Sequence, residues 1–259
     1  MDIFDSKKAI FDFNYGSALG DATMQRAYFG KKIWMREVEA AKKPVRLLCD
    51  RVLHGDFHDQ EEYDNEFYKV GHQVCDAINA AGNYYNKDHP NEFTFGNAQK
   101  LINMTMKHMY EMSYVQPDLR NCFQWCHCPA DNIMLYSVWN IYKSKNEAEK
   151  LLGDKYDFLK SWSKEDWTDI SRYQTYQKAV RKLSVEVSAV YNGPLIPIEF
   201  DYYIWGKSKD TDIVLSQGLI KYCGEAWPIF KNNYYICTYK YYGNRRYWYI
   251  SEKGYFVYR

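Results

Sequence analysis

Apolar residues recur every three or four positions along most of the first 205 residues, which is the period of an α-helix with one buried face. Prolines and glycines separate these stripes. Pro44 is expected to interrupt the helical structure and to start a new helix, because a proline cannot donate the backbone hydrogen bond of a helix interior. The stripes predict helices over residues 18–41, 44–53, 61–85, 97–109, 131–150 and 163–183, after an irregular arm over residues 1–16. The pattern therefore predicts a mainly α fold.

The pattern changes after Gly206. Residues 233–258 alternate in polarity, are rich in tyrosine and contain glycine turns at Gly243 and Gly254. β-rich runs joined by such turns predict a three-stranded antiparallel meander. We therefore expect a helical domain over residues 1–205 and a small C-terminal β appendage over residues 206–259, an organisation that 259 residues can support.

The expected appendage is basic as well as aromatic. From position 231 onward one acidic residue, Glu252, stands against Lys231, Lys240, Arg245, Arg246, Lys253 and Arg259. Such a surface can contact phosphates and stack on bases, and Arg245 and Arg246 are its candidate DNA contacts. The alternative is that the tyrosines cover the helical domain and hide a sheet edge. The net charge of the whole chain, +1 at pH 7, favours neither interpretation.

Composition limits the other classes of function. No apolar run approaches the roughly 18 residues that span a membrane, and the acidic start of the chain is unlike a signal peptide. We therefore expect a cytoplasmic protein with no membrane partner. Seven cysteines, scattered among helical stripes, fit reduced thiols better than a disulfide framework. No P-loop or iron–sulfur motif occurs, so no cofactor is expected.

Residues 122–128 hold a cluster of residue types that can bind metals, namely Cys122, Cys126, His127 and Cys128. Their spacing matches neither a zinc knuckle nor the four-cysteine cluster of iron–sulfur glycosylases, which favours a buried loop beside an active cleft. Trp125 and His127 could border a base pocket or belong to the core. His54 and His58 have a spacing that metals can use, but a predicted loop separates them. We expect no metal site.

Two predicted helix starts carry the candidate chemistry. A glycine, Gly96, opens a helix with Lys100 in its first turn, and 31 residues later Asp131 opens a second helix. Glycine lets another backbone or a phosphate come close, and the free N–H groups of a helix start favour anions. Phe95, Gly96, Asn97 and Gln99 are therefore candidate contacts to DNA.

Lys100 and Asp131 form a candidate catalytic pair. Lys100 lies off the apolar stripe, and partial burial near a helix N-terminus lowers a lysine pKa from about 10.4 towards values at which the amine is nucleophilic. Asp131 follows Pro129 and is expected to cap its helix, whose amides keep the carboxylate ionised. An amine beside a fixed carboxylate suits substitution at a carbon that develops positive charge.

This arrangement resembles the helix-hairpin-helix DNA glycosylases, in particular the archaeal 8-oxoguanine glycosylase type, through Gly96-x-x-Gln99-Lys100 and Pro129-x-Asp131. The resemblance implies that the lysine attacks the sugar C1′ and that the aspartate assists. The usual Leu-Pro-Gly-x-Gly hairpin is replaced by residues 93–97, Phe-Thr-Phe-Gly-Asn. Residues 199–205 resemble a later family segment, which implies that Asp201 and Trp205 contact the flipped base.

A broader set of bacterial proteins is similar through four short motifs: Phe95-Gly96-x-Ala98-Gln99-Lys100, His127-Cys128-Pro129-x-Asp131, Trp162-Ser163-Lys164-x-Asp166 and Tyr176-Gln177. Some glycosylases of this type remove hypermodified cytosines from phage DNA. The resemblance implies a DNA glycosylase that flips a modified base out of double-stranded DNA and leaves an abasic site, with no obligate protein partner. Three alternatives remain: an 8-oxoguanine repair glycosylase/lyase, a non-catalytic DNA-binding module, and a metal-dependent nuclease.

Overall fold

The computed structural model describes the backbone of residues 6–23, 28–29, 34–80, 84–85, 93–111, 117–164, 169–188, 195–210, 235–241, 244–250 and 256–258. Side chains are described for residues 8–19, 22, 40–80, 93–111, 118–163, 169–188 and 195–204. The chain divides into two compact units, Met1–Ile204 and Trp205–Arg259. The described residues are mainly helical, which confirms the fold class predicted from the apolar spacing.

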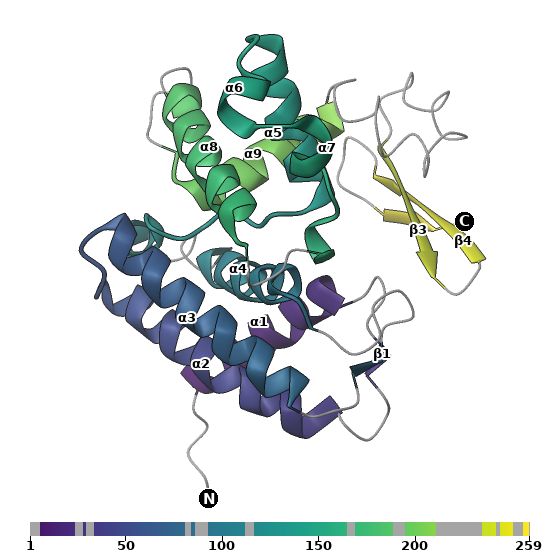
Figure 1. Ribbon diagram of the computed structural model, residues 1–259. Coiled ribbons are helices and arrows are strands. Elements are labelled where there is room, and N and C mark those ends of the chain that lie inside the picture. The colour runs from purple at the N-terminus through teal and green to yellow at the C-terminus, as the bar shows by residue number, and fades with distance from the viewer. Residues whose placement is uncertain are drawn as a thin grey trace, which may run out of the picture. The chain divides into compact units, whose positions relative to one another are not determined.

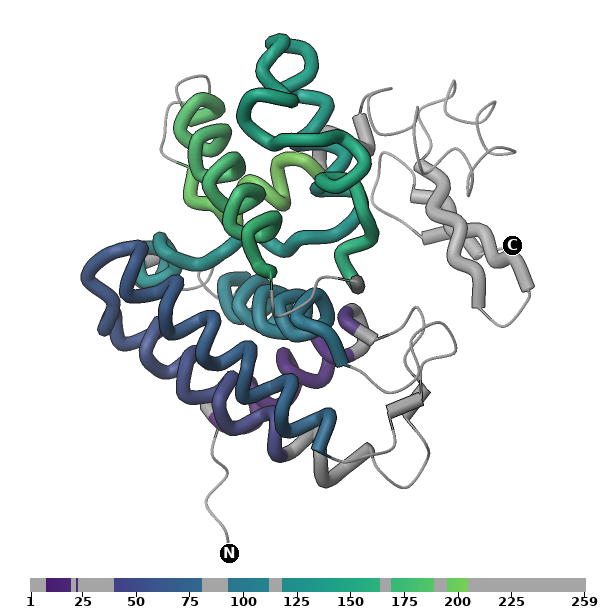
Figure 2. Tube along the Cα trace, viewed as in Figure 1, coloured from purple at the N-terminus to yellow at the C-terminus, as the bar shows by residue number. Residues whose placement is uncertain are grey.

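The first unit is built around α4 (Phe95–Glu111), a helix whose residues are nearly all buried. Helices α1 (Ser6–Thr23) and α3 (Gln60–Asn79) contact α4 directly. Helix α2 (Trp34–His54) forms an antiparallel pair with α3, and the two are joined by a short turn at Gly55 (Figure 2). In Figure 1, α4 lies between these N-terminal helices and the helices that follow it in the sequence. A residue on α4 can therefore reach both groups.

The later part of this unit consists of shorter helices. They are η2 (Pro117–Phe123), α5 (Asn132–Ser144), α6 (Ala148–Leu152), α7 (Lys155–Phe158), η3 (Trp162–Lys164), α8 (Ser171–Ser188) and α9 (Pro197–Asp210), which continues into the second unit. Helices α5 and α6 pack on α8, and both η2 and η3 contact α4. Two short strands, β1 (Tyr28–Phe29) and β2 (Tyr84–Tyr85), pair antiparallel.

The second unit contains β3 (Tyr235–Tyr241), β4 (Asn244–Ile250) and β5 (Phe256–Tyr258). Strand β4 pairs antiparallel with both of the others. The side chains of Arg245 and Arg246 lie outside those described, so their role in DNA contact stays a prediction. Among the helices that the structure describes, none combines the length and the apolar character needed to cross a membrane.

Four predictions for the N-terminal part are wrong. The helix expected over residues 18–41 is interrupted by strand β1, and the helix expected over residues 61–85 ends at Asn79, before strand β2. Residues 6–16 of the expected irregular arm are helical, because α1 buries Phe11, Tyr15 and Leu19, spaced by four residues, on one face. Pro44 does not interrupt the helix, because it lies inside α2. A proline costs one hydrogen bond and some strain in a helix, whereas the buried apolar stripe of α2 continues on both sides of it. That stripe contains Ala41, Val45, Leu48, Cys49 and Val52.

The helix start predicted at Ser163 is also wrong. Residues 162–164 form the short 3-10 helix η3, and α8 begins at Ser171, whose amide donates to the Asp169 carboxylate at 2.9 Å. The Ser163 carbonyl instead accepts a hydrogen bond of 2.9 Å from Thr94 Oγ1, at the start of α4. This tertiary contact holds the segment against α4. Helix α5 is shorter than predicted and ends at Ser144, just before Asn146 takes a positive φ of 58°.

Candidate active site

Close backbone packing determines the start of α4. An added Cβ at Gly96 would lie 1.7 Å from the Trp162 carbonyl oxygen, so a glycine is required where η3 meets the helix. Phe95 is fully buried and packs edge-on against Tyr173, with ring centroids 5.1 Å apart. The Asn97 side chain donates from Nδ2 to the Ala22 carbonyl at 3.4 Å. These three residues thus lie in the interior, and the structure does not place them to contact DNA as predicted.

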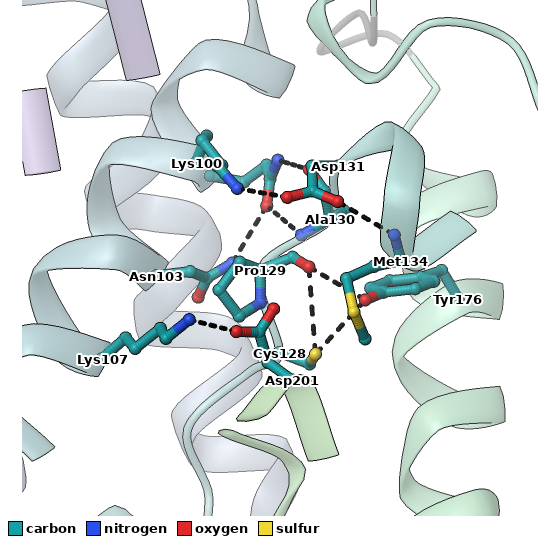
Figure 3. A network of polar contacts seen from close by, with 11 residues as sticks. Lys100, Asn103, Lys107, Cys128, Pro129, Ala130, Asp131, Met134, Tyr176 and Asp201 are labelled. Atoms are coloured by element: carbon teal, nitrogen blue, oxygen red, sulfur yellow. Dashed lines mark hydrogen bonds and ion pairs between the residues drawn. The ribbon is translucent and has the colours of Figure 1, made fainter. Parts of the chain in front are cut away.

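The structure brings Lys100 and Asp131 together. Lys100 Nζ lies 2.7 Å from Asp131 Oδ2, and the two side chains are 10% and 14% exposed (Figure 3). The second carboxylate oxygen, Oδ1, accepts a hydrogen bond of 2.9 Å from the amide of Met134. Asp131 therefore caps α5 as predicted, with one oxygen holding the helix and the other facing the amine.

Gln99, a predicted DNA contact, holds the loop that leads to Asp131. Its Nε2 donates to the carbonyl of Ala130 at 2.8 Å, and its Oε1 accepts from the amide of Ala130 at 3.1 Å. Asn103 Nδ2 donates to the same Oε1 at 3.0 Å, which fixes the orientation of the Gln99 amide. Gln99 is 1% exposed. It therefore acts on the neighbouring backbone of the protein, and no contact to DNA is available to it in this arrangement.

A second amine–carboxylate pair lies further along the same helix. Lys107, two turns after Lys100, forms an ion pair with Asp201 of α9 (Figure 3). Burial raises the pKa of the Asp201 carboxyl, and the charge of Lys107 opposes that rise. Asp201 is 1% exposed, so its predicted contact to a base requires that it be uncovered. Trp205 lies on α9 with its side chain outside those described, and its role stays a prediction.

His127 lies in the core and not at the edge of an open pocket. The Asp64 carboxylate can only accept, so His127 Nε2 carries the proton and donates to Asp64 Oδ1 at 2.7 Å. Nδ1 of the neutral ring therefore accepts the hydroxyl proton of Tyr173 at 3.0 Å, and Tyr173 accepts from Asn103 at 2.8 Å. Trp125 is half-buried and donates from Nε1 to the Phe57 carbonyl at 3.1 Å. Both residues thus serve the packing of the loop.

Acid should destabilise the fold through His127. Burial lowers its pKa below the ordinary 6.5, although the Asp64 carboxylate opposes this shift. The unfolded chain therefore binds a proton at this position more readily than the folded chain, so stability falls as the pH decreases below about 6.5. We expect the denaturant concentration at the midpoint of unfolding to decrease as the pH is lowered from 7 to 5, and to decrease less in His127→Gln. The same decrease of this midpoint in both proteins would contradict a buried neutral imidazole.

The cysteines near the site are structural. Burial raises the pKa of the Cys126 thiol to about 12, which keeps this thiol protonated at neutral pH. Cys122 is half-buried, with Sγ 3.7 Å from the Leu53 carbonyl oxygen. Within the part of the chain that the structure describes, no group of three or more histidine, cysteine, aspartate or glutamate side chains is placed to hold a metal.

Asn103, which contacts Gln99, and Lys107, which pairs with Asp201, were not predicted as site residues, because the sequence gives no signal for them beyond their spacing. They follow Lys100 by three and seven residues, which places all three on one face of α4. A small hollow, partly open to solvent, lies at the meeting point of α4, η3 and α8, and its volume of about 10 Å³ is close to that of one water molecule. Its lining residues are Gly96, Gln99, Ala130, Leu135, Trp162, Arg172, Tyr173 and Tyr176.

Comparison with family models, with curated proteins and with solved structures found no match to this chain. The similarity to glycosylases therefore rests on the short motifs around Lys100 and Asp131. The geometry of the pair, its burial and its hydrogen bonds are independent of that similarity.

Proposed function

We propose that the protein is a DNA N-glycosylase in which Lys100 and Asp131 are the reacting groups. The observation that carries the proposal is the 2.7 Å contact between Lys100 Nζ and Asp131 Oδ2, the carboxylate oxygen that does not cap α5. An amine and an oriented carboxylate, both mostly withdrawn from water, are the two groups that substitution at a sugar C1′ needs.

The reaction begins when the target base is flipped out of the duplex, because the C1′–N bond is inaccessible inside the stack. As this bond breaks, its electron pair leaves with the base, and the Asp131 carboxylate stabilises the positive charge on the sugar. Lys100 gives a proton to the departing base, and its free amine forms a bond to C1′. The C1′–O4′ bond then breaks, O4′ takes a proton from the nitrogen, and the product is a protonated Schiff base. Where water replaces the amine, Asp131 accepts the proton of the water and the product is a plain abasic site.

The substrate in this proposal is double-stranded DNA with a modified base. The similarity of the short motifs to bacterial proteins favours a bulky glucosylated hydroxymethylcytosine, in a cytoplasmic defence against phage DNA. The basic, tyrosine-rich segment after Gly206 would act as a β appendage that contacts this DNA. An 8-oxoguanine substrate is the alternative within the same chemistry.

A panel of substrates tests the proposal. The purified protein is incubated without added metal with unmodified DNA, 8-oxoguanine DNA and glucosylated-hydroxymethylcytosine phage DNA, and free base and abasic sites are quantified. We expect release from one modified DNA. Sodium borohydride in the same reaction reduces a Schiff base to a stable adduct, so mass spectrometry of the peptide that contains Lys100 separates attack by the amine from attack by water.

A non-catalytic DNA-binding module is the second candidate, and the burial of the pair favours it. An ion pair with side chains only 10% and 14% exposed can serve structure alone, since its partners already satisfy each other. Tight binding to modified DNA without release of base from any of the three DNAs would support this candidate over the enzyme.

A further inference from the structure

The three residues before Asp131 have their backbone held entirely by side chains. Cys128 and Ala130 each offer an N–H and a carbonyl, and Pro129 offers a carbonyl alone. Gln99 takes both groups of Ala130, as described above. The hydroxyl of Tyr176 donates to the Pro129 carbonyl at 2.9 Å (Figure 3). The loop thus has the fixed path that a helix or strand obtains from its own backbone bonds.

Gln177 completes this arrangement from α8. Its Nε2 donates to the Cys128 carbonyl at 2.7 Å, and its Oε1 accepts from the Cys128 amide at 3.1 Å. A primary amide matches both groups of one peptide residue in this way, so Gln177 repeats from α8 what Gln99 does from α4. Gln177 is 0% exposed and lies among apolar neighbours on its helix, where an apolar side chain would otherwise be expected.

We propose that Gln177 is a positioning residue for the reaction assigned above, on which this inference rests. Gln177 and Gln99 hold the backbone on either side of Pro129, and Asp131 follows at once with its carboxylate between the Met134 amide and Lys100. The path of the loop therefore sets the position of Asp131 Oδ2, the carboxylate oxygen that faces Lys100. A displacement of about 1 Å in a group that must face the reacting carbon can reduce the rate about 100-fold.

The test replaces Gln177 with methionine, which keeps the length and volume of the side chain but removes both hydrogen bonds. Single-turnover release of base, DNA affinity and amide hydrogen exchange are measured for Gln177→Met and for the wild-type protein. We expect release to slow about 10- to 100-fold, as for a misplaced group. DNA affinity should stay within about 3-fold, and the amides of Cys128, Ala130 and Met134 should exchange faster.

Tyr142→Phe is the matched control. It removes another buried hydrogen bond between a side chain and a backbone carbonyl, from Tyr142 of α5 to Ala179 of α8 at 3.2 Å. Release by this variant should equal that of the wild-type protein. If Gln177→Met does not fold, Gln177→Asn takes its place, because it keeps an amide that is one methylene too short to meet both groups of Cys128.

The outcomes separate this inference from the proposed function. Wild-type protein that releases no base overturns the proposed function and the positioning role with it. Release that Gln177→Met leaves at the wild-type rate overturns the positioning role alone. Slower release accompanied by unchanged exchange at Ala130 and Met134 also contradicts it, because the loop would then be held without Gln177.

Discussion

Replacing Asp131 with asparagine is expected to slow release of the modified base by about 100- to 1,000-fold, while DNA affinity stays within a few-fold of the wild-type value. Asparagine caps a helix about as well as aspartate, so the bond from the Met134 amide and the start of α5 should persist. What is lost is the negative charge beside Lys100. The measurement is single-turnover release of base together with equilibrium binding to the same DNA.

Asp154→Asn provides a matched control. Asp154 caps α7 by accepting hydrogen bonds from the amides of Tyr156 and Asp157, but it is exposed and lies outside the network of Lys100. The same chemical change at this position should leave release unaltered. An equal loss in both variants would mean that Asp131→Asn acts through general stability and not through the missing charge.

Replacing Gly96 with alanine is expected to destabilise the fold by about 3 kcal/mol or more, since it forces a methyl group into a packed interior. The added Cβ would lie 1.7 Å from the Trp162 carbonyl oxygen and 3.1 Å from the Ser163 Cα. Backbone atoms cannot turn aside as a flexible side chain can, so η3 must move away from α4. Denaturant unfolding, monitored by circular dichroism, measures the change.

Gly16→Ala is the control for this substitution. Gly16 is an exposed residue inside α1, and an added Cβ meets nothing within 4 Å. Alanine is favoured over glycine in a helix interior by roughly 0.5–1 kcal/mol, so this variant should be slightly more stable than the wild-type protein. A Gly96→Ala variant as stable as the wild type would contradict the close approach of η3 to α4.

The two helix starts were predictable because their signals are local. Pro129 followed by Asp131 and an apolar run defines a capped helix, and the structure confirms both the cap and the helix. The apolar stripe of α4 likewise follows from the sequence alone, and Ala98, Leu101 and Met109 are buried as expected. The motif spacing also suggested that Lys100 and Asp131 act together, and they lie in contact.

Other features depended on contacts between distant segments. Gly96 suggested a site for phosphate, but the same glycine equally permits the approach of another backbone, and Trp162 is 66 residues away in the sequence. Gln99 was a candidate contact to DNA, whereas its partner is the backbone of Ala130, 31 residues further on. The hydrogen bonds of Gln177 to Cys128 depend on the placement of α8 beside the loop, which no local pattern indicates.

The pair is tested by release of free base from modified DNA by the wild-type protein, by Lys100→Ala and by Asp131→Asn, without added metal. We expect release from glucosylated-hydroxymethylcytosine DNA or 8-oxoguanine DNA, not from unmodified DNA, and much slower release in both variants with binding retained. Release that persists in both variants at the wild-type rate would contradict the assignment of this pair. So would the absence of release by the wild-type protein from every DNA in the panel.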